Sequence, residues 1–126
     1  MKFIFIFSIL LNSAISLSQF AEFSFDKSVK NYQVITEGDT LKGYFVFKNK
    51  GPEPLQITKY TVECHCTEVH FPSAPTAPMA SDTIFFTFDS NGKSYAQDRK
   101  ILLYANTKKE MQIIRFKVFV NPKDNF

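Results

Sequence analysis

The sequence predicts an all-β fold within one domain. Its 126 residues include 15 Phe and 5 Tyr, and aromatic residues favour the half-buried surfaces of strands. From Phe23 onward, apolar and polar residues alternate with a period of two, which indicates strands that bury one face. No segment shows the periodicity of an amphipathic helix. Because each apolar strand face needs a second sheet to cover it, we expect an immunoglobulin-like antiparallel β-sandwich of about seven strands.

Residues 1–19 are predicted to be a signal peptide. Lys2 is followed by an apolar run at residues 3–11 and by mainly small or polar residues up to residue 19, which are the three parts of a secretory signal. The apolar run is shorter than the roughly 20 residues that a membrane helix needs. We therefore expect cleavage between residues 16 and 19. The exported domain, residues 20–126, would then lie in the periplasm or outside the cell, with no membrane span.

The formal net charge of +3 comes from scattered residues. Lys48 and Lys50, and further along Lys108 and Lys109, form isolated pairs at expected turns. Proteins that bind nucleic acid instead concentrate lysine and arginine on one face. The sequence therefore predicts no nucleic-acid partner.

The first strong strand pattern lies at residues 41–48. Leu41, Phe45 and Phe47 share one face of this strand, and lysines lie on the other. Residues 49–54 contain Asn, Gly and two Pro, which is the composition of a turn. The next strand is expected to begin directly after that turn and to run into the segment that contains the cysteines.

The second half of the chain repeats the pattern. Residues 73–78 are predicted to be a loop, because prolines cannot donate to a sheet ladder. Ile84, Phe86 and Phe88 share the inward face of the strand that follows, and residues 89–92 carry a strong turn signal. Two further strands are expected at residues 100–105 and 114–120. Residues 106–109 would form the hairpin loop between them.

Both cysteines and both histidines of the chain lie within residues 62–70. In an extended segment, side chains of equal parity share a face. One face would then hold Cys64, Cys66, Glu68 and His70, and the other His65, Thr67 and Val69. A Cys64–Cys66 disulfide is one interpretation, because residues two apart on a strand have Cα atoms about 6.6 Å apart and a relaxed bridge spans up to about 6.8 Å. Such a bridge closes a very small loop, so we expect it to be redox-labile rather than a strong staple.

Two other interpretations of this segment remain open. One is a zinc or copper site, with Cys64, Cys66 and His70 as ligands and His65 or Glu68 as a fourth group. No other cofactor is expected. Zinc sites usually leave two or more residues between their cysteines, so the spacing is atypical. Alternatively, the two cysteines are an inert, reduced pair packed beneath a loop.

The sequence does not predict an enzyme. A catalytic cysteine needs a histidine base that a third group orients, and nothing in the sequence marks that group or an oxyanion hole. The Gly-x-Ser-x-Gly turn of many hydrolases and the glycine-rich phosphate loops do not occur either.

Several motifs occur in an order that is typical of one known family. They are residues 45–57, the Cys64-His65-Cys66-Thr67 motif, residues 84–89 and residues 103–106. Together they resemble domain-of-unknown-function family 1573, which is abundant in exported proteins of Bacteroidetes-type bacteria. The resemblance covers residues 23–120 and implies an immunoglobulin-like sandwich with no established activity.

The resemblance also implies roles for individual positions. Asn49 and Gly51 would shape the turn, and Cys64, Cys66 and Thr67 would be the family's hallmark. This chain departs from the family pattern in two places. His65 stands where the family has glycine, and Met79-Ala80 stands where a glycine-containing turn is expected, so the backbone at both places is expected to differ.

These observations favour a small exported β-sandwich that acts as a binding or structural module of the cell envelope. Its partner would be a protein or another envelope component. Exposed strand edges and the proline-rich loop are the expected contact surfaces. The alternative is a metal-binding or thiol-redox protein that works through Cys64, Cys66 and His70.

Overall fold

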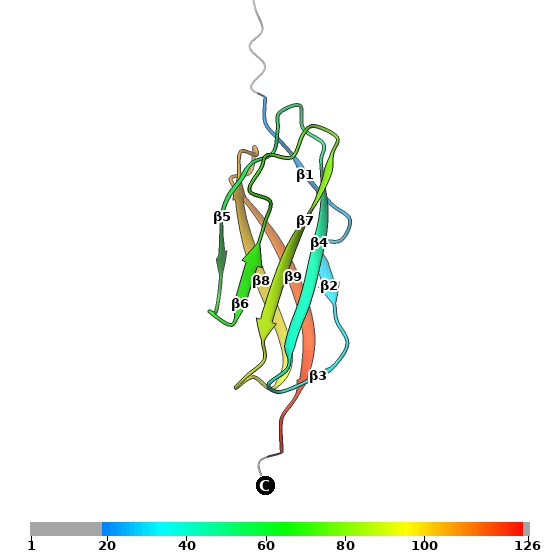
Figure 1. Ribbon diagram of the computed structural model, residues 1–126, viewed down its shortest axis with the longest axis vertical. Helices are drawn as coiled ribbons and strands as arrows, with labels where there is room; N and C mark the ends of the chain where they lie inside the picture. Colours follow the sequence, from blue (N-terminus) through cyan, green and yellow to red (C-terminus); the bar gives the residue numbers. More distant parts are fainter. Residues whose placement is uncertain (1–18, 125–126) are drawn as a thin grey trace, which may run out of the picture.

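Residues 19–124 form two β-sheets that pack face to face in the computed structural model of this chain (Figure 1). This part of the chain contains nine strands and no helix. The strands are β1 (Phe23–Phe25), β2 (Val29–Asn31), β3 (Ile35–Thr36), β4 (Thr40–Asn49), β5 (Ile57–Val62), β6 (Thr67–His70), β7 (Ser81–Asp89), β8 (Tyr95–Ala105) and β9 (Met111–Asn121). Residues 1–18 lie outside the described residues, and so does nearly all of the predicted signal peptide. Within residues 19–124, no helix is long and apolar enough to span a membrane.

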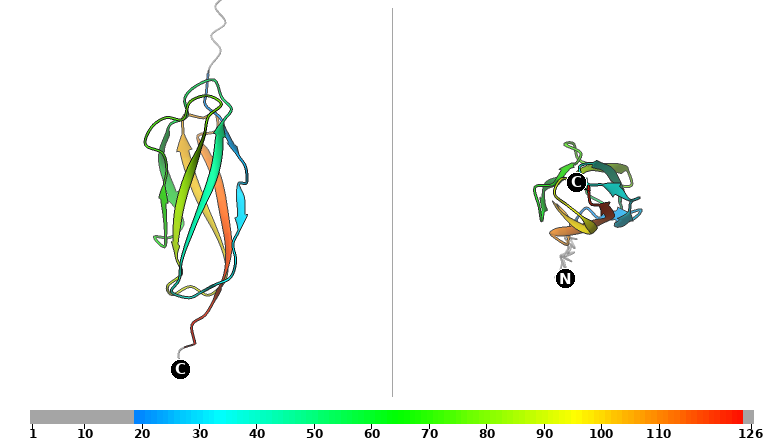
Figure 2. Two further views of the ribbon diagram at one scale, coloured as in Figure 1. Left: turned by 45° about the vertical axis from the view of Figure 1, so that its right-hand side comes forward. Right: turned by 90° about the horizontal axis from the view of Figure 1, so that it is seen from below.

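The two sheets differ in size and in strand direction. One has the order β1-β4-β7-β6, and the other has the order β2-β9-β8-β5 with β3 also paired to β9. Figure 2 shows the two layers from the side and along the long axis. The long strands pair antiparallel as predicted, but β2 and β3 run parallel to β9. The predicted β-sandwich is therefore confirmed, with nine strands where about seven were expected. The two short parallel strands have three and two residues, which is too few to show alternation in the sequence.

The predicted inward faces form the core. Phe45, Phe47, Ile84, Phe86 and Phe88 are at most 1% exposed. The ring of Phe116 in β9 stacks on that of Phe86 in β7, with ring centroids 4.4 Å apart, and so joins the two sheets. Each buried aromatic side chain contributes about 2–3 kcal/mol through the area it removes from water. The prediction of two facing layers with aromatic side chains between them is confirmed.

Strand β8 begins at Tyr95, five residues before the strand predicted at residues 100–105. The alternation fails there because Gln97 and Arg99 occupy inward-facing positions, paired with Val118 and Phe116 of β9. Both polar side chains are half-buried.

Residues 73–78 form a loop as predicted, and Thr76 anchors it by pairing with Leu55 through two backbone hydrogen bonds of 2.8 and 2.9 Å. The loop returns to β7 through Met79, whose φ is +65°. This left-handed conformation favours glycine, and glycine is the residue that the family resemblance places at this turn.

Candidate functional site

The cysteine segment is the crossover from one sheet to the other. Strand β5 is the last strand of the five-stranded sheet, and β6 is the last strand of the four-stranded sheet. The extended segment on which the parity argument depended is interrupted between Val62 and Thr67, because the chain must leave one ladder before it joins the other. A backbone hydrogen bond of 3.2 Å from Thr67 N–H to Cys64 C=O closes the turn between them, and Asp89 N–H holds it by donating to Cys66 C=O at 2.8 Å.

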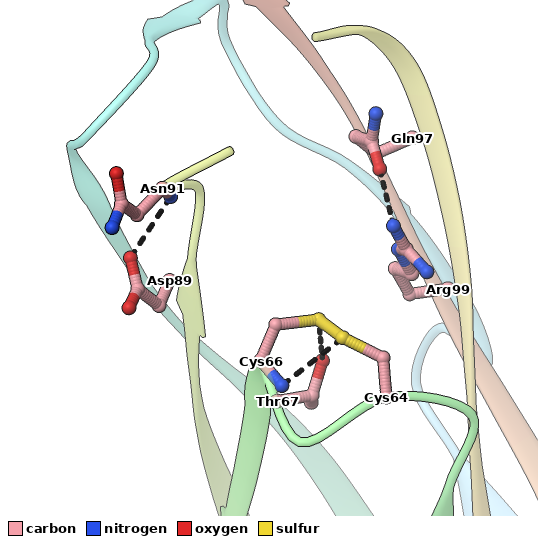
Figure 3. The surroundings of a disulfide bond; sticks show 7 residues. All are labelled: Cys64, Cys66, Thr67, Asp89, Asn91, Gln97 and Arg99. Carbon is pink, nitrogen blue, oxygen red and sulfur yellow. Dashed lines mark hydrogen bonds between the residues drawn. A yellow bond between two sulfur atoms is a disulfide. The ribbon is translucent and has the colours of Figure 1, made fainter. Parts of the chain in front are cut away.

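Cys64 and Cys66 form a disulfide within this turn (Figure 3). Their Cα atoms are 5.2 Å apart, which is closer than the spacing expected for a flat strand. The N–H of Cys66 donates a hydrogen bond of 3.0 Å to the Sγ of Cys64. In the chain-entropy model, a loop of this size stabilises the fold by about 1.6 kcal/mol, against about 3 kcal/mol for a 15-residue loop. The bond is thus a weak staple.

The two cysteines have unequal surroundings. Cys64 lines an open depression of about 490 Å³ between β5 and β6, together with the acidic side chains of Glu63 and Glu68. Cys66 packs against the hydrophobic core. Thr67, which follows it, is only 5% exposed, and its Oγ1 lies 3.9 Å from the Sγ of Cys66. Both cysteines are half-buried, but Cys64 borders the depression and Cys66 borders the core.

The histidines do not join the cysteines in one cluster. His70 lies on the outer face of β6, where its Nε2 is 3.8 Å from the Oε1 of Glu68, and both side chains are about two-thirds exposed. His65 is exposed on the turn. Among residues 19–124, no group of three or more His, Cys, Asp or Glu side chains is arranged to hold a metal ion. The candidate metal ligands are thus neighbours in sequence that meet at most in pairs, as the Cys64–Cys66 disulfide and the contact of His70 with Glu68.

Asn49 joins three loops at the opposite end of the sandwich. Its buried side chain accepts hydrogen bonds from the N–H of Glu22 at 3.2 Å and of Gly51 at 3.0 Å. It also donates to the C=O of Glu53 at 2.7 Å and of Thr76 at 3.0 Å. Asn49 therefore does more than shape one turn, because it also ties the N-terminal segment and the proline-rich loop to β4.

Gly51 permits a close approach of the chain to itself. A Cβ at this position would lie within 3.0 Å of the backbone of residues 20–21. The N–H of Gly51 is one of the two N–H groups that donate a hydrogen bond to the Asn49 side chain. The turn residues named by the family resemblance thus hold the start of the domain in place.

The residues of β8 near the disulfide were not predicted from the sequence. Figure 3 draws Gln97 and Arg99 among the surroundings of the disulfide, where an Nη of Arg99 donates to the Oε1 of Gln97. The Nε of Arg99 is buried and has no hydrogen-bond partner within the described residues.

The opposite side of the sandwich, between β2 and β4, is closed by side chains. The Nζ of Lys30 donates to the C=O of Tyr44 at 2.5 Å and lies 4.0 Å above its ring. The N–H of Asp26 donates to the C=O of Val46 at 3.2 Å. Burial lowers the pKa of Lys30 and raises the pKa of Tyr32. These contacts cap the free edge of β4, whereas β5 and β6 have open edges.

Comparisons with solved structures show the fold. A crystal structure of a protein of unknown function from Porphyromonas gingivalis W83 is similar with 16% identity and a TM-score of 0.69, over 84% of this chain and 50% of that chain. The chain thus spans half the length of that protein. The PapD-like domain 7 of human CEP192 is similar with 10% identity and a TM-score of 0.54, over 85% of this chain and 89% of that domain.

A third similar structure, the VesB protease of Vibrio cholerae, has 14% identity and a TM-score of 0.59, over 79% of this chain and 31% of that chain. Identities this low carry the fold and no activity. None of the curated proteins matches this chain.

The family assignment comes from the sequence of the domain itself. The model of the family described as "Protein of unknown function (DUF1573)" matches residues 23–120, from the first residue of β1 to the penultimate residue of β9. This range contains the Asn49 turn, the disulfide and all of the buried core except Ala21. The chain therefore belongs to the DUF1573 family, and its fold is an immunoglobulin-like β-sandwich.

Proposed function

We propose that this chain is an exported, non-catalytic module of the bacterial cell envelope that binds an extended segment of a partner protein along β5. The observation that supports this proposal is that β5 and β6 are the outermost strands of their sheets on the same side of the molecule. The outer edge of an edge strand offers unpaired N–H and C=O groups, to which an extended peptide adds as a further strand.

Strand β5 is the better template of the two. It has six residues against four in β6, so it offers more backbone groups. A bulge between Ile57 and Lys59 and a lysine at the edge limit its self-association. The opposite edge, along β4, is capped by Lys30 and the backbone of Asp26.

Side chains along β5 indicate what kind of segment fits. Tyr60 and Val62 face the space between the sheets and are only partly buried, and the ring of Tyr60 contacts that of Phe71 with centroids 6.3 Å apart. Lys59 is exposed on the outer face, with its Nζ 4.5 Å from the ring centroid of Tyr104. We therefore expect a partner segment with apolar residues at alternate positions and an acidic residue opposite Lys59.

Selection from a display library of random decapeptides tests the binding proposal. The expected result is peptides with alternating apolar residues that slow amide hydrogen exchange of the folded chain at residues 58–62. N-methylation of a peptide amide that faces β5 should abolish binding, and N-methylation of the next amide, which faces away, serves as the matched control. Peptides without alternation, or protection at another surface, would contradict the proposal.

Export needs a separate experiment. We expect the full-length chain, when expressed in a bacterium with an envelope, to be recovered outside the cytoplasm with a mass that lacks the residues up to a cleavage point between 16 and 19. Recovery of the uncleaved mass from the cytoplasm would contradict export without affecting the strand-addition proposal.

A further inference from the structure

We propose that the Cys64–Cys66 disulfide is a thiol–disulfide exchange site that oxidises a dithiol on a partner protein. In this assignment Cys64 is the sulfur that exchanges with the partner, and Cys66 is the sulfur that leaves when the bond opens. The activity goes beyond strand addition and does not depend on it, because it follows from the surroundings of the two sulfurs.

Access distinguishes the two sulfurs. Cys64 lines the open depression between β5 and β6, whereas Cys66 packs against the core. Exchange requires an incoming thiolate to reach one sulfur of the bond. Both cysteines are half-buried, but of the two only Cys64 lines the depression, so we assign the attack to its sulfur, and the bond breaks with Cys66 as the leaving group.

Hydrogen-bond donors are placed for the thiolates that form when the bond opens. The N–H of Cys66 already donates to the Sγ of Cys64 at 3.0 Å, and a hydrogen bond to the charged form favours a thiolate. The hydroxyl of Thr67 lies 3.9 Å from the Sγ of Cys66 and is positioned to donate to it as that sulfur leaves. Thr67 is buried, so this hydroxyl is costly to place in the core without such a partner.

Arg99 is the cation among the surroundings of the disulfide that Figure 3 draws, with its guanidinium directed at Gln97, and its Nε has no hydrogen-bond partner within the described residues. Nearby positive charge favours the thiolate form of a cysteine. A disulfide that closes a three-residue loop restricts the unfolded chain only slightly and so adds little stability. A role in stability alone therefore does not account for this bond.

The step balances as follows. A thiolate of the partner attacks the Sγ of Cys64 and forms a mixed disulfide, while the Cys64–Cys66 bond breaks and its electron pair passes to the Sγ of Cys66, which takes a proton. The second thiol of the partner, as its thiolate, then attacks the partner's sulfur of the mixed disulfide and releases Cys64. Two electrons pass from the partner, which becomes a disulfide, to this chain, which becomes a dithiol.

The first test measures the reduction of the folded full-length chain by dithiothreitol, with free thiols counted by alkylation and mass spectrometry. We expect reduction without unfolding, and a rate about fivefold lower for Thr67→Val because one hydrogen bond to the leaving sulfur is lost. Thr67→Ser should restore the rate. Thr76→Val is the matched control, since Thr76 is also 5% exposed but belongs to the loop anchored by Asn49.

The second test uses glutathione disulfide to assign the exchanging sulfur. We expect Cys66→Ser, which leaves Cys64, to form the mixed disulfide at least about tenfold faster than Cys64→Ser, which leaves Cys66. Equal rates for the two variants, reduction of the wild type only as fast as it unfolds, or a Thr67→Val rate equal to that of Thr76→Val would overturn the assignment. If a cysteine variant does not fold, the dithiothreitol series on the wild type and the threonine variants still decides.

Discussion

Replacement of Asn49 by alanine tests how the domain holds its loops. The change removes four hydrogen bonds. Those to Gly51 N–H and Thr76 C=O lie in buried surroundings, and those to Glu22 N–H and Glu53 C=O are partly buried. At about 1–1.5 kcal/mol for each buried bond and about 0.5–1 kcal/mol for each of the others, we expect the free energy of unfolding to fall by about 3–5 kcal/mol.

Urea-induced unfolding of the disulfide-intact protein, followed by far-UV circular dichroism, measures this loss, since the chain has no Trp. With a slope of about 1.5 kcal/mol per molar urea, the midpoint should fall by about 2–3 M with the slope unchanged. Asn121→Ala is the matched control, because the Asn121 side chain is exposed at the end of β9, and it should change stability by less than about 0.5 kcal/mol. A loss below about 1 kcal/mol for Asn49→Ala would refute the reasoning.

Three further substitutions test other contacts by the same urea assay. Gly51→Ala should cost about 2 kcal/mol or more, because its Cβ meets backbone atoms of residues 20–21; a neutral result would show that the N-terminal segment is not fixed there. Met79→Gly should stabilise by about 0.5–1 kcal/mol, because φ is +65° and the side chain is exposed; a loss of stability would argue against that backbone. A hydrogen bond from Arg115 holds the pKa of Asp98 below its usual range, so the folded state favours the carboxylate and gains stability above the unfolded pKa of about 3.9. Asp98→Asn should therefore lower stability slightly at pH 7 and not in strong acid, below both pKa values; a difference that persists in acid would point to another cause.

The sequence predicted the parts of the fold that depend on burial. Strands β4 and β7 pair over nine residues, and each alternates long enough for its inward face to be recognised. Strand β2 and the first half of β8 were missed for two physical reasons. A three-residue strand has no period to detect, and Gln97 and Arg99 place polar side chains on an inward face.

The site was harder to predict because it depends on how the two sheets meet. The parity argument placed Cys64 and His70 on one face of a strand, but the chain turns between them as it crosses from β5 to β6. Asn49 was predicted to be a turn residue. Its hydrogen bonds to Glu22 and Thr76, each 27 residues away along the chain, were not predicted. Sequence spacing carries no information about contacts of that kind.

Amide hydrogen exchange of the folded, disulfide-intact chain tests the central claim, that β5 presents an open edge. We predict that the central amides of β4 and β7, which are buried between neighbouring strands, exchange only through global unfolding. Alternate amides of residues 58–62, on the outer edge of β5, should exchange at least about a hundredfold faster. Uniform protection of these amides, equal to that of β7, would show that the edge is already covered and would contradict the account.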